Sequence, residues 1–405
     1  MHSDNRQCVF SFFLIATSIA IGVGPLYLLF VSPDSILETG RLQIDSFIAP
    51  IFIVGLFVIS ILYHRLGSYI YTSIKQFIPL LLLWLLLLFS SVLYSRNGAN
   101  VSFNIPFLGA IFFYITCKGS MEDYPQTVKA SLKAYVYTCG IVSLIYLLLI
   151  GSPFTLVSKG RYFFLGENPN SYSTRMAVSI ICAIFFLEGN NLKQKIILGT
   201  LILSQSIVIF LSGSRGAVFM LVIGVVVYLF SSFKGGQKLR INFLLPIGLI
   251  LMVGMILFGS LDFGEASMGA RLLGFFESND TGGRIELWKD SYAIFSDNPF
   301  IGVGSEGFIR EMQLRFGENR DAHNLFLYLL TTGGIIGFLL FLYFLLPITF
   351  KAINQVKVQA YSITLIILMY FVAFKSGGVL SYSLLWYTLA IASALLNNRK
   401  KVSIE

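Results

Sequence analysis

Charged residues are scarce in this chain of 405 residues. Only 12% of the residues are Asp, Glu, Lys or Arg, whereas 56% are hydrophobic and the mean hydropathy is +0.79. A soluble globular domain is about 25% charged, so this composition excludes an ordinary cytosolic enzyme. It also excludes a disordered chain, which would be poor in apolar residues. The apolar runs are continuous and not alternating, which argues against a membrane β-barrel.

Motifs for metal, disulfide and nucleotide chemistry are missing as well. The four cysteines, Cys8, Cys117, Cys139 and Cys182, lie in or at the ends of apolar segments and form no CxxC pair. We therefore expect them to be small packing residues. The sequence contains no Walker loop and no DxD-like acidic pair. We expect no metal, no nucleotide and no other cofactor.

The sequence has long apolar runs instead. A helix that spans a bilayer needs about 20 mostly apolar residues. The first run, from Cys8 to Val31, is too long for the apolar part of a signal peptide, so we expect a retained helix. Twelve such segments are present, at 8–31, 46–63, 76–95, 101–117, 134–150, 171–187, 194–212, 216–232, 241–259, 324–350, 359–375 and 379–397. The sequence therefore predicts an all-α polytopic membrane protein, with residues 1–405 as a single integral membrane domain.

The distribution of Lys and Arg predicts the orientation in the membrane. An even number of spans puts both termini on one side, and sixteen of the 29 basic residues fall on that side. Seven fall on the short loops and helix ends of the opposite side. The positive-inside rule then places both termini in the cytoplasm. The net charge of +9 is thus explained by topology, and we expect no nucleic acid partner.

One outward loop, residues 260–323, is long and hydrophilic. It holds eleven of the 20 acidic residues and six basic ones, and loops of this length are usually functional or disordered. A first helix is predicted after an N-cap at 279–281, with Ile285, Trp288, Tyr292 and Phe295 on its apolar face, ending at Asp297-Asn298-Pro299. A second is predicted from Glu306 to Phe316, with Phe308, Met312 and Phe316 on one face. Such helices tend to lie in the membrane interface, and a passive lid is the alternative.

Three positions on the outward side are candidates for chemistry, because a charge at the edge of the hydrocarbon layer is costly. Arg215 follows a tight turn in which Ser214 supplies a hydroxyl, and a guanidinium there can bind a phosphate bidentately or snorkel to lipid headgroups. His323, beside Asn324, is the only outward histidine and can accept a proton from a hydroxyl or cap a helix. Arg284, near a helix start, can hold an anion or remain solvated.

Weaker candidates lie in the loop before the sixth apolar segment and between the last two. Arg161 and Arg175 could line the same cavity, although each alone has an ordinary structural explanation. Lys375 could touch a substrate, but anchoring at the membrane interface is the preferred interpretation. Arginines suit a diphosphate and a histidine suits activation of a sugar hydroxyl, so a lipid-linked diphosphate donor fits this set of residues.

The order of several motifs resembles the O-antigen ligase and O-antigen polymerase family of bacterial inner-membrane proteins. The motifs are Ser-Gly-Ser-Arg-Gly (212–216), Gly-Gly-Arg-x3-Trp (282–288), Asn-Pro-Phe-x-Gly-Val-Gly (298–304), His-Asn-Leu-Phe (323–326) and Gly-Gly-Ile-Ile-Gly (333–337). The similarity is strongest from about residue 160 to 345. It implies a C-type glycosyltransferase-like fold of about twelve transmembrane helices with one large periplasmic loop.

The resemblance also implies an activity. The family transfers a glycan from undecaprenyl diphosphate, without a metal and with inversion, at the periplasmic face. By this similarity Arg215 and Arg284 bind the diphosphate, and His323 activates the acceptor hydroxyl. Substrate contacts are expected from Arg161, Arg175, Ser214 and Asn324.

Polymerisation of lipid-linked repeat units is the preferred activity, and ligation to lipid A–core is the alternative. The expected partners are the lipid-linked donor, a glycan or lipid A–core acceptor, the lipid bilayer and, as a further candidate, a chain-length regulator protein. A transporter or flippase of lipid-linked sugars or small anions is the competing hypothesis from another class. The chain shows no internal repeat to support it, and its candidate residues lie at one face and not at the midplane.

Overall fold

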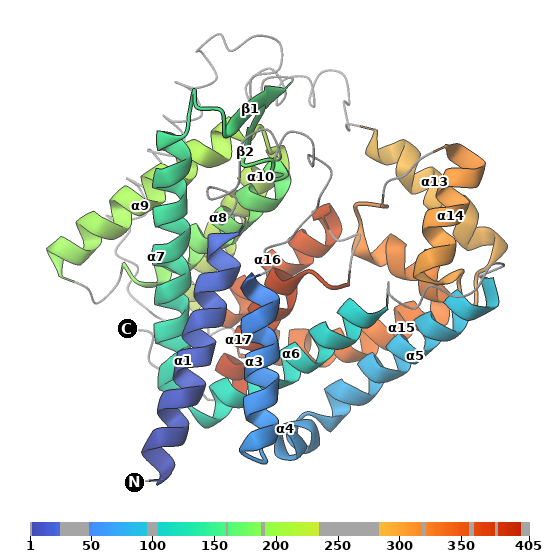
Figure 1. Ribbon diagram of the computed structural model, residues 1–405, viewed down its shortest axis with the longest axis horizontal. Helices are drawn as coiled ribbons and strands as arrows, with labels where there is room; N and C mark the ends of the chain where they lie inside the picture. The colour runs from blue at the N-terminus through green and yellow to red at the C-terminus, as the bar shows by residue number, and fades with distance from the viewer. Residues whose placement is uncertain are drawn as a thin grey trace.

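The computed structural model describes residues 2–24, 48–94, 104–158, 161–187, 191–234, 283–317, 321–355, 360–376 and 380–397. These residues form a mostly helical structure with one small hairpin (Figure 1). The elements are α1 (His2–Val23), α3 (Ile48–Leu62), α4 (Leu66–Thr72), α5 (Ile74–Tyr94), α6 (Ile105–Asp123), α7 (Gln126–Leu148), β1 (Thr155–Ser158), β2 (Arg161–Phe164), α8 (Pro169–Phe185), α9 (Leu192–Leu211), α10 (Arg215–Lys234), α13 (Arg284–Asp297), α14 (Gly304–Phe316), α15 (Leu325–Asn354), α16 (Ala360–Ser376) and α17 (Ser383–Asn397).

The structure confirms an all-α membrane fold. Eleven of the twelve predicted apolar segments overlap a helix, and the ninth, 241–259, lies outside the described residues. Six described helices are long and apolar enough to cross a membrane, or seven if α3 and α4, which meet at a 97° bend, form one broken span. The number of twelve spans is therefore not confirmed, because several of the remaining helices are short or carry more charge.

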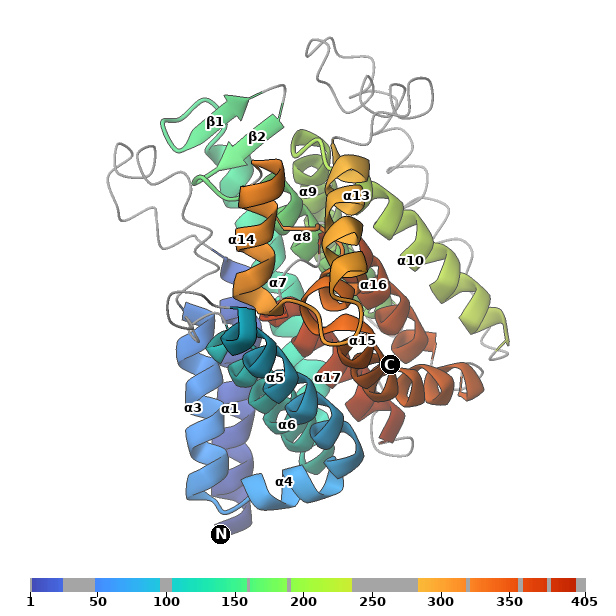
Figure 2. The ribbon, with the colours of Figure 1, turned by 90° about the vertical axis from the view of Figure 1, so that its right-hand side faces the viewer.

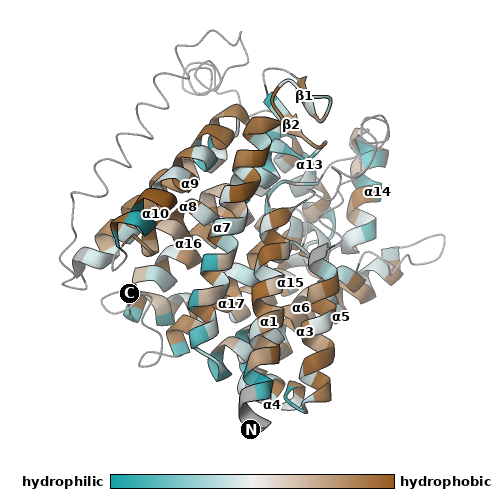
Figure 3. Ribbon diagram, turned by 60° about the vertical axis from the view of Figure 1, so that its left-hand side comes forward, coloured by the Kyte–Doolittle hydropathy of each residue, from teal (hydrophilic) through white to brown (hydrophobic). Residues whose placement is uncertain are grey.

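The outer surface of the helices is apolar. Large side chains such as Phe89 on α5 and Phe230 on α10 are more than half exposed, and Figure 3 shows α9 and α10 as mostly hydrophobic and α14 as more hydrophilic. An exposed apolar surface of this extent is unfavourable in water and is what a bilayer requires. The chain is a multi-pass membrane protein.

Both predicted loop helices are present and share a small core of their own. The helices α13 and α14 stand side by side over α5 and α15 (Figure 2). Their shared core is a cluster of fully buried apolar side chains. Its members are Leu287, Ile294, Val303, Phe308, Met312 and Ala322. The predicted apolar face of α14 is confirmed for Phe308 and Met312 and wrong for Phe316, which is 36% exposed. The two helices form a packed layer over the membrane helices.

The predicted apolar face of α13 is wrong. Ile285 and Tyr292 are 42% and 60% exposed, whereas Leu287, Ser291 and Ile294 are the buried residues. The helix packs against α15 on one side and α14 on another, so its inward face follows those neighbours and not the largest side chains. The predicted N-cap at 279–281 lies outside the described residues, and the structure begins α13 from Gly283, with φ +75°.

A break in α15 at Gly334 anchors this layer. Gly334 has φ +63° and ψ −166°, a conformation open essentially only to glycine. The N–H groups on its C-terminal side are donated to the turn after α13: Ile335 N donates to Pro299 O at 2.8 Å and Ile336 N to Phe300 O at 3.2 Å. The two glycine-containing motifs at 298–304 and 333–337 therefore dock on each other.

The hairpin of β1 and β2 is absent from the sequence prediction. The strands pair antiparallel, with Thr155 opposite Phe164 and Ser158 opposite Arg161. The ring of Phe164 stacks on Tyr146 of α7 at 4.7 Å, and the hydroxyl of Tyr172 in α8 donates to Tyr162 O at 2.6 Å. The hairpin is thus fixed to α7 and α8, at the end of the molecule opposite the N-terminus (Figure 1).

We expect Gly334→Ala to destabilise the protein. A Cβ there would lie 2.2 Å from Phe300 O, and the backbone strain adds about 1–3 kcal/mol. The matched control is Gly199→Ala in α9, where no atom lies within 4 Å of the new Cβ and helix propensity gains up to about 1 kcal/mol. Thermal unfolding in detergent should show a lower Tm for the first variant only. Equal Tm values for both variants would contradict the docking role of the break.

Candidate active site

The turn between α9 and α10 carries Arg215 and is held from within. Gly213 has φ +62°, which glycine adopts without strain. The hydroxyl of Ser212 donates to Ile209 O at 2.6 Å and accepts from the N–H of Ser214 at 3.0 Å. Arg215 is the first residue of α10 and is partly exposed. Its backbone position is therefore fixed while its side chain remains accessible.

Arg161 clamps this turn from the hairpin. Its Nε donates to Ser212 O at 2.9 Å, and its Nη2 donates to Asn170 Oδ1 at 3.0 Å. The guanidinium, which is also partly exposed, thus joins β2, α8 and the Arg215 turn. The structure thus brings Arg161 to the turn that carries Arg215, whereas the sequence prediction pairs Arg161 with Arg175.

Lys375, near the end of α16, joins Arg161 and Arg215 in one cluster of cations. It is 4% exposed, and its Nζ donates to Ser214 Oγ at 3.0 Å and to Thr174 Oγ1 at 3.1 Å. An interfacial anchor extends toward headgroups and water, so the preferred interpretation of Lys375 is wrong. Ser214, a predicted substrate contact, is itself buried and accepts this bond.

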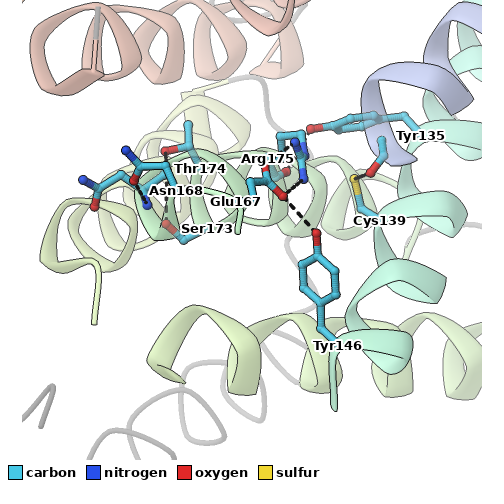
Figure 4. Close-up of polar contacts among 10 residues, drawn as sticks. Tyr135, Cys139, Tyr146, Glu167, Asn168, Ser173, Thr174 and Arg175 are labelled. Carbon is cyan, nitrogen blue, oxygen red and sulfur yellow. Dashed lines mark hydrogen bonds and ion pairs between the residues drawn. The ribbon is translucent and has the colours of Figure 1, made fainter. Parts of the chain in front are cut away.

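Arg175 belongs to an internal ion pair. Its Nη1 and Nη2 lie 2.6 Å and 2.7 Å from the two carboxylate oxygens of Glu167, and Tyr146 donates its hydroxyl to Glu167 Oε2 at 2.9 Å (Figure 4). The two charged side chains are 11% and 9% exposed. A bidentate pair of this kind neutralises both charges, so we assign Arg175 a structural role under the hairpin in place of the predicted substrate contact.

Arg284 reaches the cluster through α13, of which it is the first residue. One turn later, Trp288 donates its Nε1–H to Ala322 O at 3.0 Å, and its ring lies edge-on to Phe374 with centroids 5.6 Å apart. Trp288 thus connects α13 to the residues next to His323 and Lys375. Arg284 and Arg161 both lie close enough to Lys375 to repel its ammonium.

His323 is held by a carboxylate that the sequence interpretation did not assign. Asp321 Oδ1 accepts from His323 N at 2.7 Å and lies 2.8 Å from His323 Nδ1. The residue has φ +46°, a region that few residues other than glycine adopt. With the proton on Nδ1, the Nε2 atom is the acceptor, and the side chain is 34% exposed. The arrangement suits a general base.

Asn324 caps the helix that follows. Its side-chain oxygen accepts from Phe326 N at 3.0 Å and Leu327 N at 3.2 Å, and the residue is 7% exposed. This is the usual geometry of an N-cap. It fixes the start of α15 directly after His323, and any substrate contact by Asn324 would have to use its amide nitrogen.

Comparison with known proteins finds a family model that matches part of the chain. Residues 198–342 match a family model described as O-Antigen ligase, and no curated protein matches the chain. All five motifs named above lie inside the matched range. Arg161, Arg175 and Lys375 lie outside it, so the contacts that join them to the Arg215 turn rest on the structure alone.

Removing the charge of Glu167 should destabilise the protein strongly. Breaking a buried pair leaves an uncompensated charge and costs about 3–5 kcal/mol, so we expect Glu167→Gln to lower the Tm sharply. The double variant Glu167→Gln with Arg175→Met should recover most of the loss. The control is Arg315→Gln, which breaks the exposed contacts of Arg315 with Glu311 and Asp297 and should cost about 0–1 kcal/mol. Equal losses for the buried and exposed pairs would refute the structural assignment.

Proposed function

We propose that this chain, a member of the O-antigen ligase and polymerase family by its match over residues 198–342, transfers a glycan from undecaprenyl diphosphate to a sugar hydroxyl. The observation that carries the proposal is the His323–Asp321 pair, joined through Ala322 and Trp288 to the helix of Arg284. A base and several cations at one end of a membrane protein are the two elements that transfer from a lipid diphosphate requires.

The reaction proceeds as a single displacement. The acceptor hydroxyl gives its proton to His323 Nε2 while its oxygen forms a bond to the anomeric carbon of the donor. The bond between that carbon and the diphosphate oxygen breaks, and its electron pair remains on the diphosphate. Attack from the face opposite the leaving group inverts the anomeric configuration. Asp321 holds the imidazole in the correct tautomer and stabilises the imidazolium that forms.

Arg215 and Arg284 stabilise the departing diphosphate. Negative charge increases on its terminal oxygens in the transition state, and guanidinium groups bind such oxygens in a bidentate manner. The charge stabilisation that other enzymes obtain from a metal ion comes here from side chains, so the proposed transfer is metal-independent. Arg161 supports the Arg215 turn through Ser212 O.

The proposed setting is the bacterial inner membrane, with both termini in the cytoplasm and the site at the periplasmic face. The hairpin, which contacts the Arg215 turn, and α13, which begins at Arg284, lie away from the N-terminus (Figure 1), which supports a face-bound enzyme over a transporter with a midplane site. We take residues 1–405 as one integral membrane domain in which 260–323 forms the periplasmic loop. A chain-length regulator is proposed as a partner protein.

For the residues, we expect His323→Ala to lower the transfer rate about 10²–10⁴-fold, and Arg215→Ala or Arg284→Ala to lower it about 10²–10³-fold. The assay is transfer from a synthetic undecaprenyl-diphosphate glycan by purified protein. The matched control is His64→Ala, because His64 also has a positive φ, +54°, but lies in the turn between α3 and α4 at the other end of the molecule. Full activity in all three site variants would refute the assignment.

The acceptor is proposed to be another lipid-linked repeat unit, as in a polymerase. Deleting the gene and separating the surface glycans on a gel tests this. Loss of a polymerase should leave glycan of a single repeat unit. Bare lipid A–core with accumulated lipid-linked polymer would instead identify a ligase, and unchanged glycans would contradict both activities.

A further inference from the structure

Lys375 is a buried cation that the proposed reaction does not yet use. Its stem crosses the start of α10, because a Cβ on Gly216 would lie 2.5 Å from Lys375 Cδ. Only glycine at position 216 leaves room for this path. The side chain of Lys375 is therefore packed against the Arg215 turn. This packing explains why a glycine follows Arg215.

The ammonium group has a donor left over. It carries three N–H groups, and two are given to the hydroxyls of Ser214 and Thr174. The hydroxyl of Thr174 donates its proton to Asn170 O at 2.6 Å. Thr174 Oγ1 is therefore the acceptor in its hydrogen bond with Lys375 Nζ. Within the described ranges, no third acceptor lies at the Lys375 Nζ atom.

The charge of Lys375 is also unbalanced. In the part of the chain that the structure describes, no carboxylate forms an ion pair with it. Glu167 is paired with Arg175. The charged groups that act on Lys375 are Arg161 and Arg284, and both are cations. Burying an ion without a partner costs several kcal/mol.

A second buried lysine in the same chain shows how a buried ammonium is ordinarily neutralised by a carboxylate. Lys118 in α6 is 2% exposed and also donates to a serine, with its Nζ 2.7 Å from Ser73 Oγ. Its charge is balanced by Glu122, whose Oε1 lies 3.1 Å away. Among the described residues, Lys375 has the serine but no carboxylate, so a bound anion would complete its surroundings.

We infer that Lys375 binds the lipid diphosphate directly, as a third cation beside Arg215 and Arg284. The inference rests on the proposed function. Lys375 ends a membrane helix, whereas Arg284 begins α13, which lies farther from the N-terminal end of the molecule (Figures 1 and 2). The polyprenyl chain of the donor lies in the hydrocarbon layer. In this inference, Lys375 binds the phosphate attached to that chain, and Arg284 binds the sugar-side phosphate.

Lipid binding by the full-length protein in nanodiscs tests the inference. The probes are undecaprenyl diphosphate, undecaprenyl monophosphate and undecaprenol, and the readout is the Kd for each. The wild-type protein should bind both phosphate lipids and bind undecaprenol weakly. Lys375→Met should weaken both phosphate lipids at least tenfold and leave undecaprenol unchanged, whereas Lys375→Arg should restore part of the loss.

Two comparisons separate a ligand contact from a structural role. Lys118→Met removes a buried lysine far from the site, so it should lower the Tm while each Kd changes less than twofold. Ser214→Ala removes a partner of Lys375 but keeps its charge, so it should cost less affinity than Lys375→Met. Wild-type affinity of Lys375→Met for both phosphate lipids, or an equal loss for undecaprenol, would overturn the inference. A wild-type protein that does not distinguish phosphate lipids from undecaprenol would instead overturn the proposed function and, with it, this inference.

Discussion

A cation at the edge of a hydrocarbon layer must find a partner, because neither lipid nor protein interior solvates it well. The ways in which this chain satisfies that requirement separate its structural cations from its functional ones. Arg175 is neutralised by Glu167 and Lys118 by Glu122. Lys375 has only hydroxyl partners among the described residues. We propose that Arg215, Arg284 and Lys375, which lie at the ends of α10, α13 and α16, bind the substrate.

The packing of the loop layer decides where those charges stand. Trp288 connects Ala322 and Phe374, so one side chain relates the helix of Arg284 to the residues beside His323 and Lys375. Below it, the break at Gly334 turns two backbone N–H groups toward the turn after α13. The proposed site is therefore formed by elements packed against one another, and in the proposed function a substrate binds charges that are already positioned.

Much of this could be predicted from the sequence. Apolar length alone located most helices, and helical spacing located α13 and α14 in the loop. The order of motifs indicated the similarity to O-antigen ligases that the family model matches over residues 198–342, and it singled out Arg215, Arg284 and His323 as candidates. The structural features that the sequence did not predict depend on contacts between residues that are distant along the chain. The inward face of α13 is set by α14 and α15, and the four-residue strands of the hairpin are too short to give a clear periodic signal.

Lys375 shows the limit most clearly. A lysine at the end of an apolar segment has the same sequence pattern whether it extends to headgroups or turns inward. The inward direction of the Lys375 side chain depends on Gly216 and Thr174, which are 159 and 201 positions away along the chain. The role of Asp321 could have been predicted more easily, since it lies only two residues before His323. A carboxylate at that spacing, before a histidine at the end of a loop, is a signal that the sequence did contain.

The central claim is that one cluster of cations holds the lipid diphosphate beside His323. The most direct test is a cryo-EM structure of the protein in a nanodisc with undecaprenyl diphosphate bound. We expect diphosphate density between Arg215, Arg284 and Lys375, with the polyprenyl chain running into the bilayer and His323 facing the terminal phosphate. Diphosphate density at any other place on the protein, with this cluster unchanged, would contradict it.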